Sequence, residues 1–251
     1  MKQLILHIPH ASTYIPDVTG YLLNSEALQA EIQKLTDWYT DELFSNKLDE
    51  TVIAPFSRVF CDVERFTDDL LEPMAKSGMG VLYEKTDEGK PMRQVSAGLR
   101  YEVVEKYYNL HHLRLTETVE KQLAKYNSAL LIDCHSFPDI PLKRDLDQNT
   151  RRPDFNLGTD SFHTPPQLAH LARQFFTERG FSVEINRPYA GTLVPLQWYH
   201  ADKRVYSLML EVNRRLYLQS GTNKKNSNYK KVQAVVQQFL DHVRNGNCYQ
   251  E

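Results

Sequence analysis

Cysteine and long apolar runs are both scarce in this chain of 251 residues. No apolar run approaches the roughly 18 residues of a membrane-spanning helix, and no cationic segment precedes an apolar one at the N-terminus. We therefore expect no membrane partner and, by default, a cytoplasmic protein. The three cysteines, Cys61, Cys134 and Cys248, are scattered and odd in number, which argues against a disulfide framework and favours a reducing compartment.

Two common catalytic motifs are also missing. The sequence contains no Gly-x-Ser-x-Gly nucleophile elbow and no glycine-rich phosphate loop, so neither a serine hydrolase of that type nor a nucleotide-binding protein is indicated. The net charge of −2 gives no electrostatic reason to expect nucleic acid or an anionic membrane as a partner.

The pattern of apolar residues predicts an α/β fold. Hydrophobic content of 41% is typical of a soluble globular protein, and the length suits one domain over residues 1–251. Expected strands cover residues 2–9, 52–55 with 58–60, 129–134, 181–186 and 206–212; expected helices cover 25–48, 99–126, 166–179 and 227–244; expected loops cover 67–97 and 137–166. Because strands and helices alternate, we predict a mostly parallel or mixed central sheet with helices on both faces.

Three of the predicted strands end in side chains that suit a hydrolytic metal site. The apolar run at 129–136 ends with Asp133 and His135, His10 follows the first strand, and Glu211 ends the strand at 206–212. The carboxyl ends of strands form the sites of α/β sheets. Three such strand ends together make an enzyme the leading interpretation.

Strand ends hold imidazole rings at fixed angles, which a metal requires. Asp133 shares a strand face with His135 and is placed to accept its second imidazole N–H, although it could instead bind loop amides. A catalytic zinc takes three protein ligands and leaves a position for water. We expect the third ligand to be Asp37, on the helix after the His10 loop, with Asp41 one turn later as a rival.

Glu211 follows strongly apolar residues, where an unpaired carboxylate is costly to bury. Burial raises the pKa of such a group toward neutrality, which suits a general base. The alternative is an ion pair with Arg214 or Arg215. Cys134, between Asp133 and His135, is expected to point to the opposite face and pack in the core.

Arginine and histidine supply candidates for substrate contact. Arg58, Arg65 and Arg187 lie in polar segments, and guanidinium groups grip carboxylates through paired hydrogen bonds, which suits an acidic small molecule. Each could instead form a surface ion pair. His111 and His112 point about 100° apart on a helix, so we expect at most one of them to face a site.

The chain resembles the N-formylglutamate amidohydrolase (deformylase) family. The resemblance rests on these segments, in order: Pro9-His10-Ala11-Ser12, Thr36-Asp37-Trp38-Tyr39, Ser57-Arg58-Val59, Asp62-Val63-Glu64-Arg65, Tyr107 to His112, Leu131-Ile132-Asp133-Cys134-His135-Ser136, Asn186-Arg187-Pro188-Tyr189-Ala190-Gly191 and Leu210-Glu211-Val212-Asn213-Arg214. Together with Leu216-Tyr217, which also matches, they run over residues 9–217, nearly the whole chain.

The resemblance implies a fold similar to zinc carboxypeptidases and cell-wall amidases. It assigns His10, Asp37 and His135 to one Zn²⁺ and Glu211 to the general base. The carboxypeptidase pattern has a glutamate three residues after its first histidine, where this chain has Thr13, and the acidic ligand is therefore sought at Asp37.

The family implies hydrolysis of N-formyl-L-glutamate to formate and glutamate, a late step of one histidine-degradation route. It places Arg58, Arg65, Arg187, Tyr189 and His112 near the substrate. Two alternatives stay open: a zinc peptidase or cell-wall amidase of the same fold, and a metal-free binding module. The sequence sets no oligomeric state.

Overall fold

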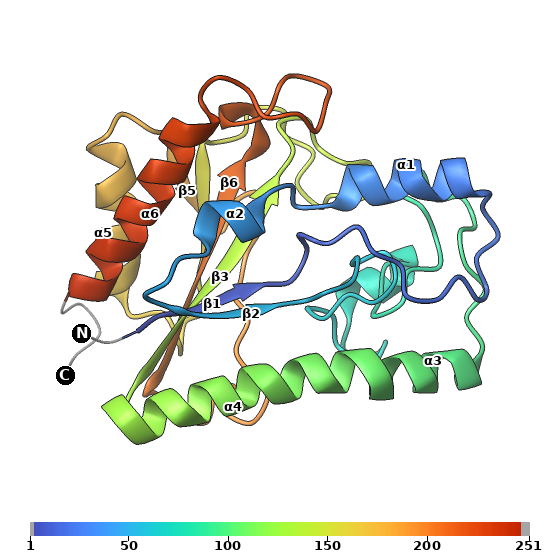
Figure 1. The fold of residues 1–251 in the computed structure, drawn as a ribbon, viewed down its shortest axis with the longest axis horizontal. Coiled ribbons are helices and arrows are strands. Elements are labelled where there is room, and N and C mark those ends of the chain that lie inside the picture. Colours follow the sequence, from blue (N-terminus) through green and yellow to red (C-terminus); the bar gives the residue numbers. More distant parts are fainter. Residues whose placement is uncertain (1–2, 247–251) are drawn as a thin grey trace.

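A six-stranded sheet with helices on both faces forms the frame of the protein, which the computed structural model describes over residues 3–246 (Figure 1). Its strands are β1 (Ile5–Ile8), β2 (Glu50–Ile53), β3 (Ala129–Phe137), β4 (Phe155–Gly158), β5 (Val183–Ile185) and β6 (Val205–Asn213). The order is β2-β1-β3-β6-β4-β5, and every neighbouring pair is parallel except β4 and β6. The predicted α/β class with a mixed sheet is confirmed.

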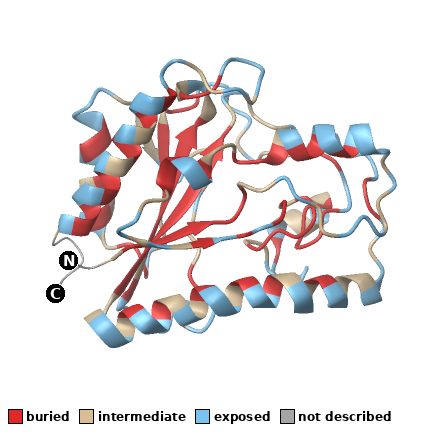
Figure 2. Cartoon of the chain, viewed as in Figure 1, coloured by how far each residue is buried: buried red, intermediate tan, exposed pale blue. Residues whose placement is uncertain are grey.

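Helices cover the two faces of the sheet. They are α1 (Ser25–Leu35), α2 (Thr40–Phe44), η1 (Pro73–Ser77), α3 (Ala97–Val103), the π-helical turn η2 (Val104–Tyr108), α4 (Asn109–Tyr126), α5 (Pro166–Thr177), η3 (Arg214–Leu216) and α6 (Tyr229–Asn245). In Figure 1, α4 runs along one side of the sheet, and α5 and α6 lie together on the other. Figure 2 shows β1, β3, β4 and β6 almost entirely buried, the edge strands β2 and β5 partly exposed, and the long helices buried along one side only.

Side chains on the two faces of the sheet differ in chemistry. On the face toward α5 and α6, Ile132, Cys134 and Leu210 belong to the largest apolar cluster, together with Phe239 of α6. The predicted core position of Cys134 is confirmed. Removing such side chains from water, at about 25 cal/mol per Å², is the main source of stability on this face.

The opposite face is apolar at one end and polar at the other. At the amino ends of the strands, Ile5, Leu131 and Val205 pack with Leu115 and Val119 of α4. Further along β1, β3 and β6, the positions that alternation puts on this face are His7, Asp133, His135, Met209 and Glu211. The carboxyl ends of three adjacent strands therefore present polar side chains at one edge.

The predicted helix over residues 25–48 is wrong, because the segment is divided into α1 and α2. The chain leaves the helical conformation at Thr36, which is extended, and Tyr39 adopts a left-handed conformation with φ 63°. Asp37 lies in this break and not on a helix. Asp41, its rival as a ligand, is exposed on α2. The side chain of Asn24 caps α1 by accepting a hydrogen bond from the Ala27 backbone N–H.

Smaller differences concern short elements. The segment at 137–166, expected to be a loop, contains β4, and residues 58–60 form a turn instead of a strand. Cys61 and Cys134 are free and buried, and Cys248 lies outside the described residues. Within residues 3–246, no helix has both the length and the apolar character needed to cross a membrane.

Candidate active site

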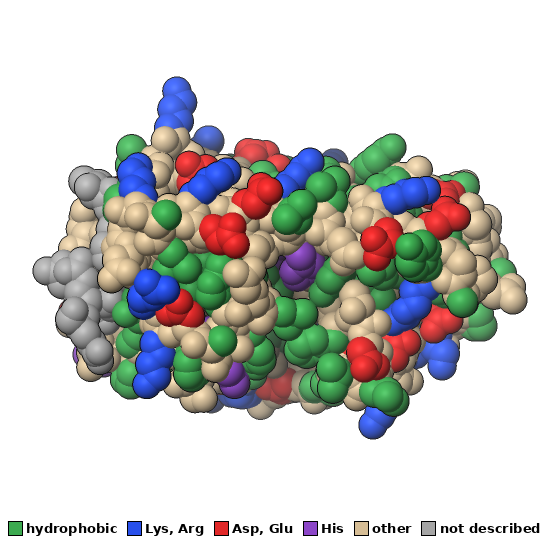
Figure 3. Space-filling model, turned by 90° about the horizontal axis from the view of Figure 1, so that it is seen from below, with side chains coloured by type: hydrophobic (Ala, Val, Ile, Leu, Met, Phe, Trp, Pro, Cys, Tyr) green, Lys and Arg blue, Asp and Glu red, His purple; other side chains and the backbone are tan. Residues whose placement is uncertain are grey.

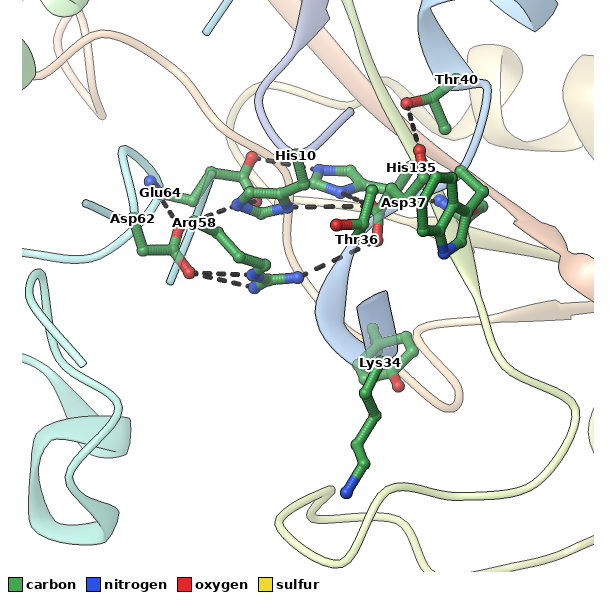
Figure 4. Close-up of polar contacts among 12 residues, drawn as sticks. His10, Lys34, Thr36, Asp37, Thr40, Arg58, Asp62, Glu64 and His135 are labelled. Carbon is green, nitrogen blue, oxygen red and sulfur yellow. Dashed lines mark hydrogen bonds and ion pairs between the residues drawn. The ribbon is translucent and has the colours of Figure 1, made fainter. Parts of the chain in front are cut away.

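Three side chains from distant parts of the sequence meet at the carboxyl edge of the sheet (Figure 4). His10 follows β1, Asp37 lies between α1 and α2, and His135 is near the end of β3. One potential ligand atom of each lies within 4.8 Å of the others, and all three side chains are buried. Asp37 Oδ2 is 3.1 Å from His135 Nδ1 and 3.7 Å from His10 Nδ1.

The outer nitrogens of both imidazoles contact carboxylates. His10 Nε2 lies 2.8 Å from Asp62 Oδ1. His135 Nε2 lies 3.2 Å from Asp133 Oδ1, the contact expected from the sequence, and 3.1 Å from Glu64 Oε1. Because these carboxylates favour a proton on Nε2, Nδ1 is the nitrogen of each ring that faces Asp37 and that would bind a metal.

The donor set fits a divalent transition metal. His10 Nδ1 is buried and has no hydrogen-bond partner among the described residues, which is costly unless something occupies the space before it. Two imidazole nitrogens and one carboxylate oxygen are typical of a catalytic zinc site that keeps one position open.

Asp37 is held ionised by its neighbours. Burial opposes its ionisation, but the nearby imidazoles of His10 and His135 and the charge of Arg214 lower its pKa below the usual value. Arg214 Nη2 donates to Asp37 Oδ1 at 2.8 Å. The Asp37 backbone N–H also donates to the carbonyl of His10 at 3.0 Å, which ties the two segments together.

Glu211 lies beside His135 in the register of β3 and β6 and is only 6% exposed. Its Oε2 is buried and has no hydrogen-bond partner within the described part of the chain. Arg214 binds Asp37 and Ser136, and Arg215 binds two other aspartates, so the alternative of an ion pair with Glu211 is not observed. Burial, reinforced by Asp37 and opposed by His135 and Arg214, raises the pKa of Glu211 to about 8.

Two of the expected substrate contacts, Arg65 and His112, line a cavity of about 290 Å³. Arg65 Nε is buried without a hydrogen-bond partner among residues 3–246 and lies 3.6 Å from Asp62 Oδ2. His112 Nε2 donates to the carbonyl of Val63 at 2.8 Å, and burial lowers the pKa of this imidazole to about 4. Glu64 and Asp133, which contact His135, form part of the same cavity wall.

The other three expected contacts are occupied by neighbours. Arg58 binds Asp62 through Nη2 at 3.0 Å and thereby supports the carboxylate that holds His10. Arg187 forms surface ion pairs at 2.9 and 2.6 Å with Asp147 and Glu184. Tyr189 bonds Asp145 and Arg152, and neither Arg187 nor Tyr189 lines the cavity.

A larger groove of about 640 Å³ lies on the other side of Arg214, lined by Lys34, Trp38, Asp139 and Arg215 among others. In Figure 4, Lys34 extends away from the three clustered side chains. On the α4 side of the molecule, Figure 3 shows acidic and basic side chains interspersed among apolar ones around a central hollow.

Several contributors to the site are not among the residues predicted from the sequence. Asp62 and Glu64 belong to a segment that matches the family, and two acids spaced one residue apart before Arg65 are a usable signal for a site. His7 was hidden inside an apolar strand, and the partnership of Arg214 with Asp37 joins residues 177 positions apart. Neither of these contacts is visible in local sequence spacing.

Fold and site together define an α/β protein with a buried cluster of histidines and carboxylates at the carboxyl edge of a mixed sheet. The sequence profile of the N-formylglutamate amidohydrolase family matches residues 2–218, and the chain belongs to that family of enzymes. No match was found among curated proteins.

Two solved structures share the fold. The N-formylglutamate amidohydrolase of Ralstonia eutropha JMP134 superposes with a TM-score of 0.83 at 24% identity, over 98% of this chain and 96% of its own. A gene product of Agrobacterium tumefaciens gives a TM-score of 0.68 at 17% identity, over 97% of this chain and 89% of its own. These similarities support the mixed α/β architecture.

Proposed function

We propose that this protein is a zinc-dependent amidohydrolase that cleaves N-formyl-L-glutamate, or a closely similar N-acyl amino acid, to the carboxylic acid and the free amine. The observation that carries the proposal is the convergence of His10, Asp37 and His135 beside an unpaired, buried Glu211. The family of the chain supports the reaction type.

The Nδ1 atoms of His10 and His135 and Oδ2 of Asp37 would hold the metal. When bound, zinc supplies an acidified water and polarises the amide carbonyl. Glu211 would accept a proton from the attacking water and pass it to the leaving amine nitrogen. Its raised pKa gives the carboxylate a proton affinity close to neutrality, which suits both transfers.

Arg65 is the side chain best placed to bind a substrate carboxylate. Arg65 lines the cavity and makes only a long ion pair, 3.6 Å from Nε to Asp62, whereas Arg58 and Arg187 are held by acidic residues at 3.0 and 2.6 Å. A carboxylate bound there would fix the orientation of a small substrate, and such orientation lowers the barrier for attack on the formyl carbon. His112, neutral and beside the same cavity, adds a polar wall.

The test combines metal analysis of the purified protein with a panel of N-formyl and N-acetyl amino acids and a short peptide. We expect one zinc per chain, formate release from N-formylglutamate, and loss of turnover with metal retained in Glu211→Gln. Cleavage of the peptide alone would favour the peptidase alternative. Turnover of no compound, with melting temperatures unaffected by zinc, would favour the binding module.

A further inference from the structure

A line of buried hydrogen-bonded side chains leads from His135 to α4. Asp133 Oδ1 lies 3.2 Å from His135 Nε2 and 2.9 Å from His7 Nδ1. His7 Nε2 in turn lies 2.9 Å from Nε2 of His111, in the first turn of α4. The four residues are at most 3% exposed. His7 and His111 have no part in the reaction described above.

The chemistry of the groups fixes the direction of each hydrogen bond. The Asp133 carboxyl lies among three nitrogens: Oδ1 faces those of His7 and His135, and Oδ2 faces the backbone N–H of Leu193. An ionised carboxylate only accepts hydrogen bonds, so the Asp133 oxygens receive N–H groups from His7 Nδ1, His135 Nε2 and the Leu193 backbone, the last at 3.0 Å.

A His7 ring whose one proton sits on Nδ1 accepts a hydrogen bond at Nε2. The group that faces this nitrogen is His111 Nε2, which must therefore donate. Burial lowers the pKa of His111 to about 2, so His111 is a neutral ring with one N–H to donate. Asp133 thus determines the tautomer of His7, and His7 determines the tautomer of His111.

We propose that His7 and His111 are positioning residues that hold Asp133 toward His135 and so leave His135 Nδ1 free to bind a metal. The inference rests on the proposed zinc site. If His111 loses its N–H, His7 Nε2 is left as a buried acceptor without its donor, which favours a shift of the His7 ring away from Asp133. His135 then loses the partner that fixes its tautomer, and metal affinity falls.

The experiment measures the dissociation constant for Zn²⁺, by competition with a chromophoric chelator, in wild type and in three variants. His7→Leu and His111→Leu remove the line at two points, and His111→Gln keeps an N–H donor. We expect the two leucine variants to bind zinc about 10–100-fold more weakly and His111→Gln to stay within about threefold of wild type. His163→Leu is the control, because His163 is equally buried but bonds the carbonyl of Val205 at the amino end of β6.

Melting temperatures separate positioning from general damage. A purely structural role lowers the melting temperature of His7→Leu and His163→Leu alike and leaves zinc affinity unchanged, which would overturn the inference. If His7→Leu fails to fold, the comparison of His111→Leu with His111→Gln decides, and equal affinities there overturn it as well.

The number of zinc ions bound per chain is a further test. His7, Glu64 and Asp133 also bring potential ligand atoms within 4.8 Å of one another. Two zinc ions per wild-type chain, with one lost in His7→Leu, would make His7 a ligand and refute the positioning role. A wild type that binds no zinc would reject the proposed function itself, and this inference with it.

Discussion

The environment of Glu211 predicts that the stability of the protein depends on pH. Its pKa rises from 4.5 to about 8 on folding, chiefly because the carboxyl group is removed from water. In metal-free protein, the unfolded chain therefore loses this proton at lower pH than the folded one. Burial of Glu211 therefore lowers the free energy of unfolding. This destabilisation is absent below about pH 4.5, grows as the pH rises to about 8, and is constant above that.

Replacement of Glu211 by glutamine removes this destabilisation. We expect Glu211→Gln to unfold at the same denaturant concentration as wild type near pH 4.5 and to be more stable near pH 9, by on the order of a few kcal/mol. The measurement is urea unfolding at both pH values in the presence of a chelator. An equal difference at the two pH values would show that the pKa of Glu211 is not raised.

Replacement of Arg65 tests whether this residue binds the substrate carboxylate. Arg65→Leu removes a charged donor, worth roughly 1.5–3 kcal/mol, and is expected to raise KM for N-formylglutamate about 10–100-fold with zinc content unchanged. Arg187→Leu is the matched control, since it removes only surface ion pairs. Equal kinetics for the two variants would contradict a role of Arg65 in substrate binding.

At the scale of elements, the end of α1 determines where Asp37 lies. Thr36 Oγ1 donates to the Ile32 carbonyl at 2.7 Å and Thr40 Oγ1 to the Asp37 carbonyl at 3.0 Å, so hydroxyl groups on both sides fix the break between α1 and α2. Asp37 thus receives its geometry from a helix terminus, which holds a side chain better than a free loop does.

Two substitutions at opposite ends of α1 test this. Asn24→Ala and Thr36→Val each remove one hydrogen bond and should each cost about 1 kcal/mol of stability. Only Thr36→Val, beside Asp37, is expected to weaken zinc binding, by about threefold or more. Zinc titration and urea unfolding of both variants measure this, and equal zinc affinities would refute the role of the break.

The same segment shows where prediction from sequence stops. The strand ends bearing His10, His135 and Glu211 were predicted, because apolar runs that end in polar residues are local signals. No glycine or proline marks the break at Thr36, and Phe155–Gly158 is too short to stand out from its loop. The sequence therefore predicts Asp37 as a candidate ligand but wrongly predicts that it lies on a helix.

At the scale of the whole molecule, one face of the sheet contributes to stability at one end and carries the candidate site at the other. Apolar residues at the amino ends of the strands pack on α4, and polar residues at the carboxyl ends form the candidate site. Those polar residues are held by side chains from other segments of the chain, namely Asp62, Glu64 and His7. The order of the strands brings these segments together. Such contacts depend on tertiary structure and leave no periodic trace in the sequence.

The proposed function requires that His10, Asp37 and His135 bind one zinc ion beside Glu211. Crystals of the zinc-loaded protein, measured on both sides of the zinc absorption edge, would locate the ion. We expect a single anomalous peak contacted by Nδ1 of His10, Nδ1 of His135 and a carboxylate oxygen of Asp37. A peak at His7, Glu64 and Asp133 instead, or no peak within residues 3–246, would contradict it.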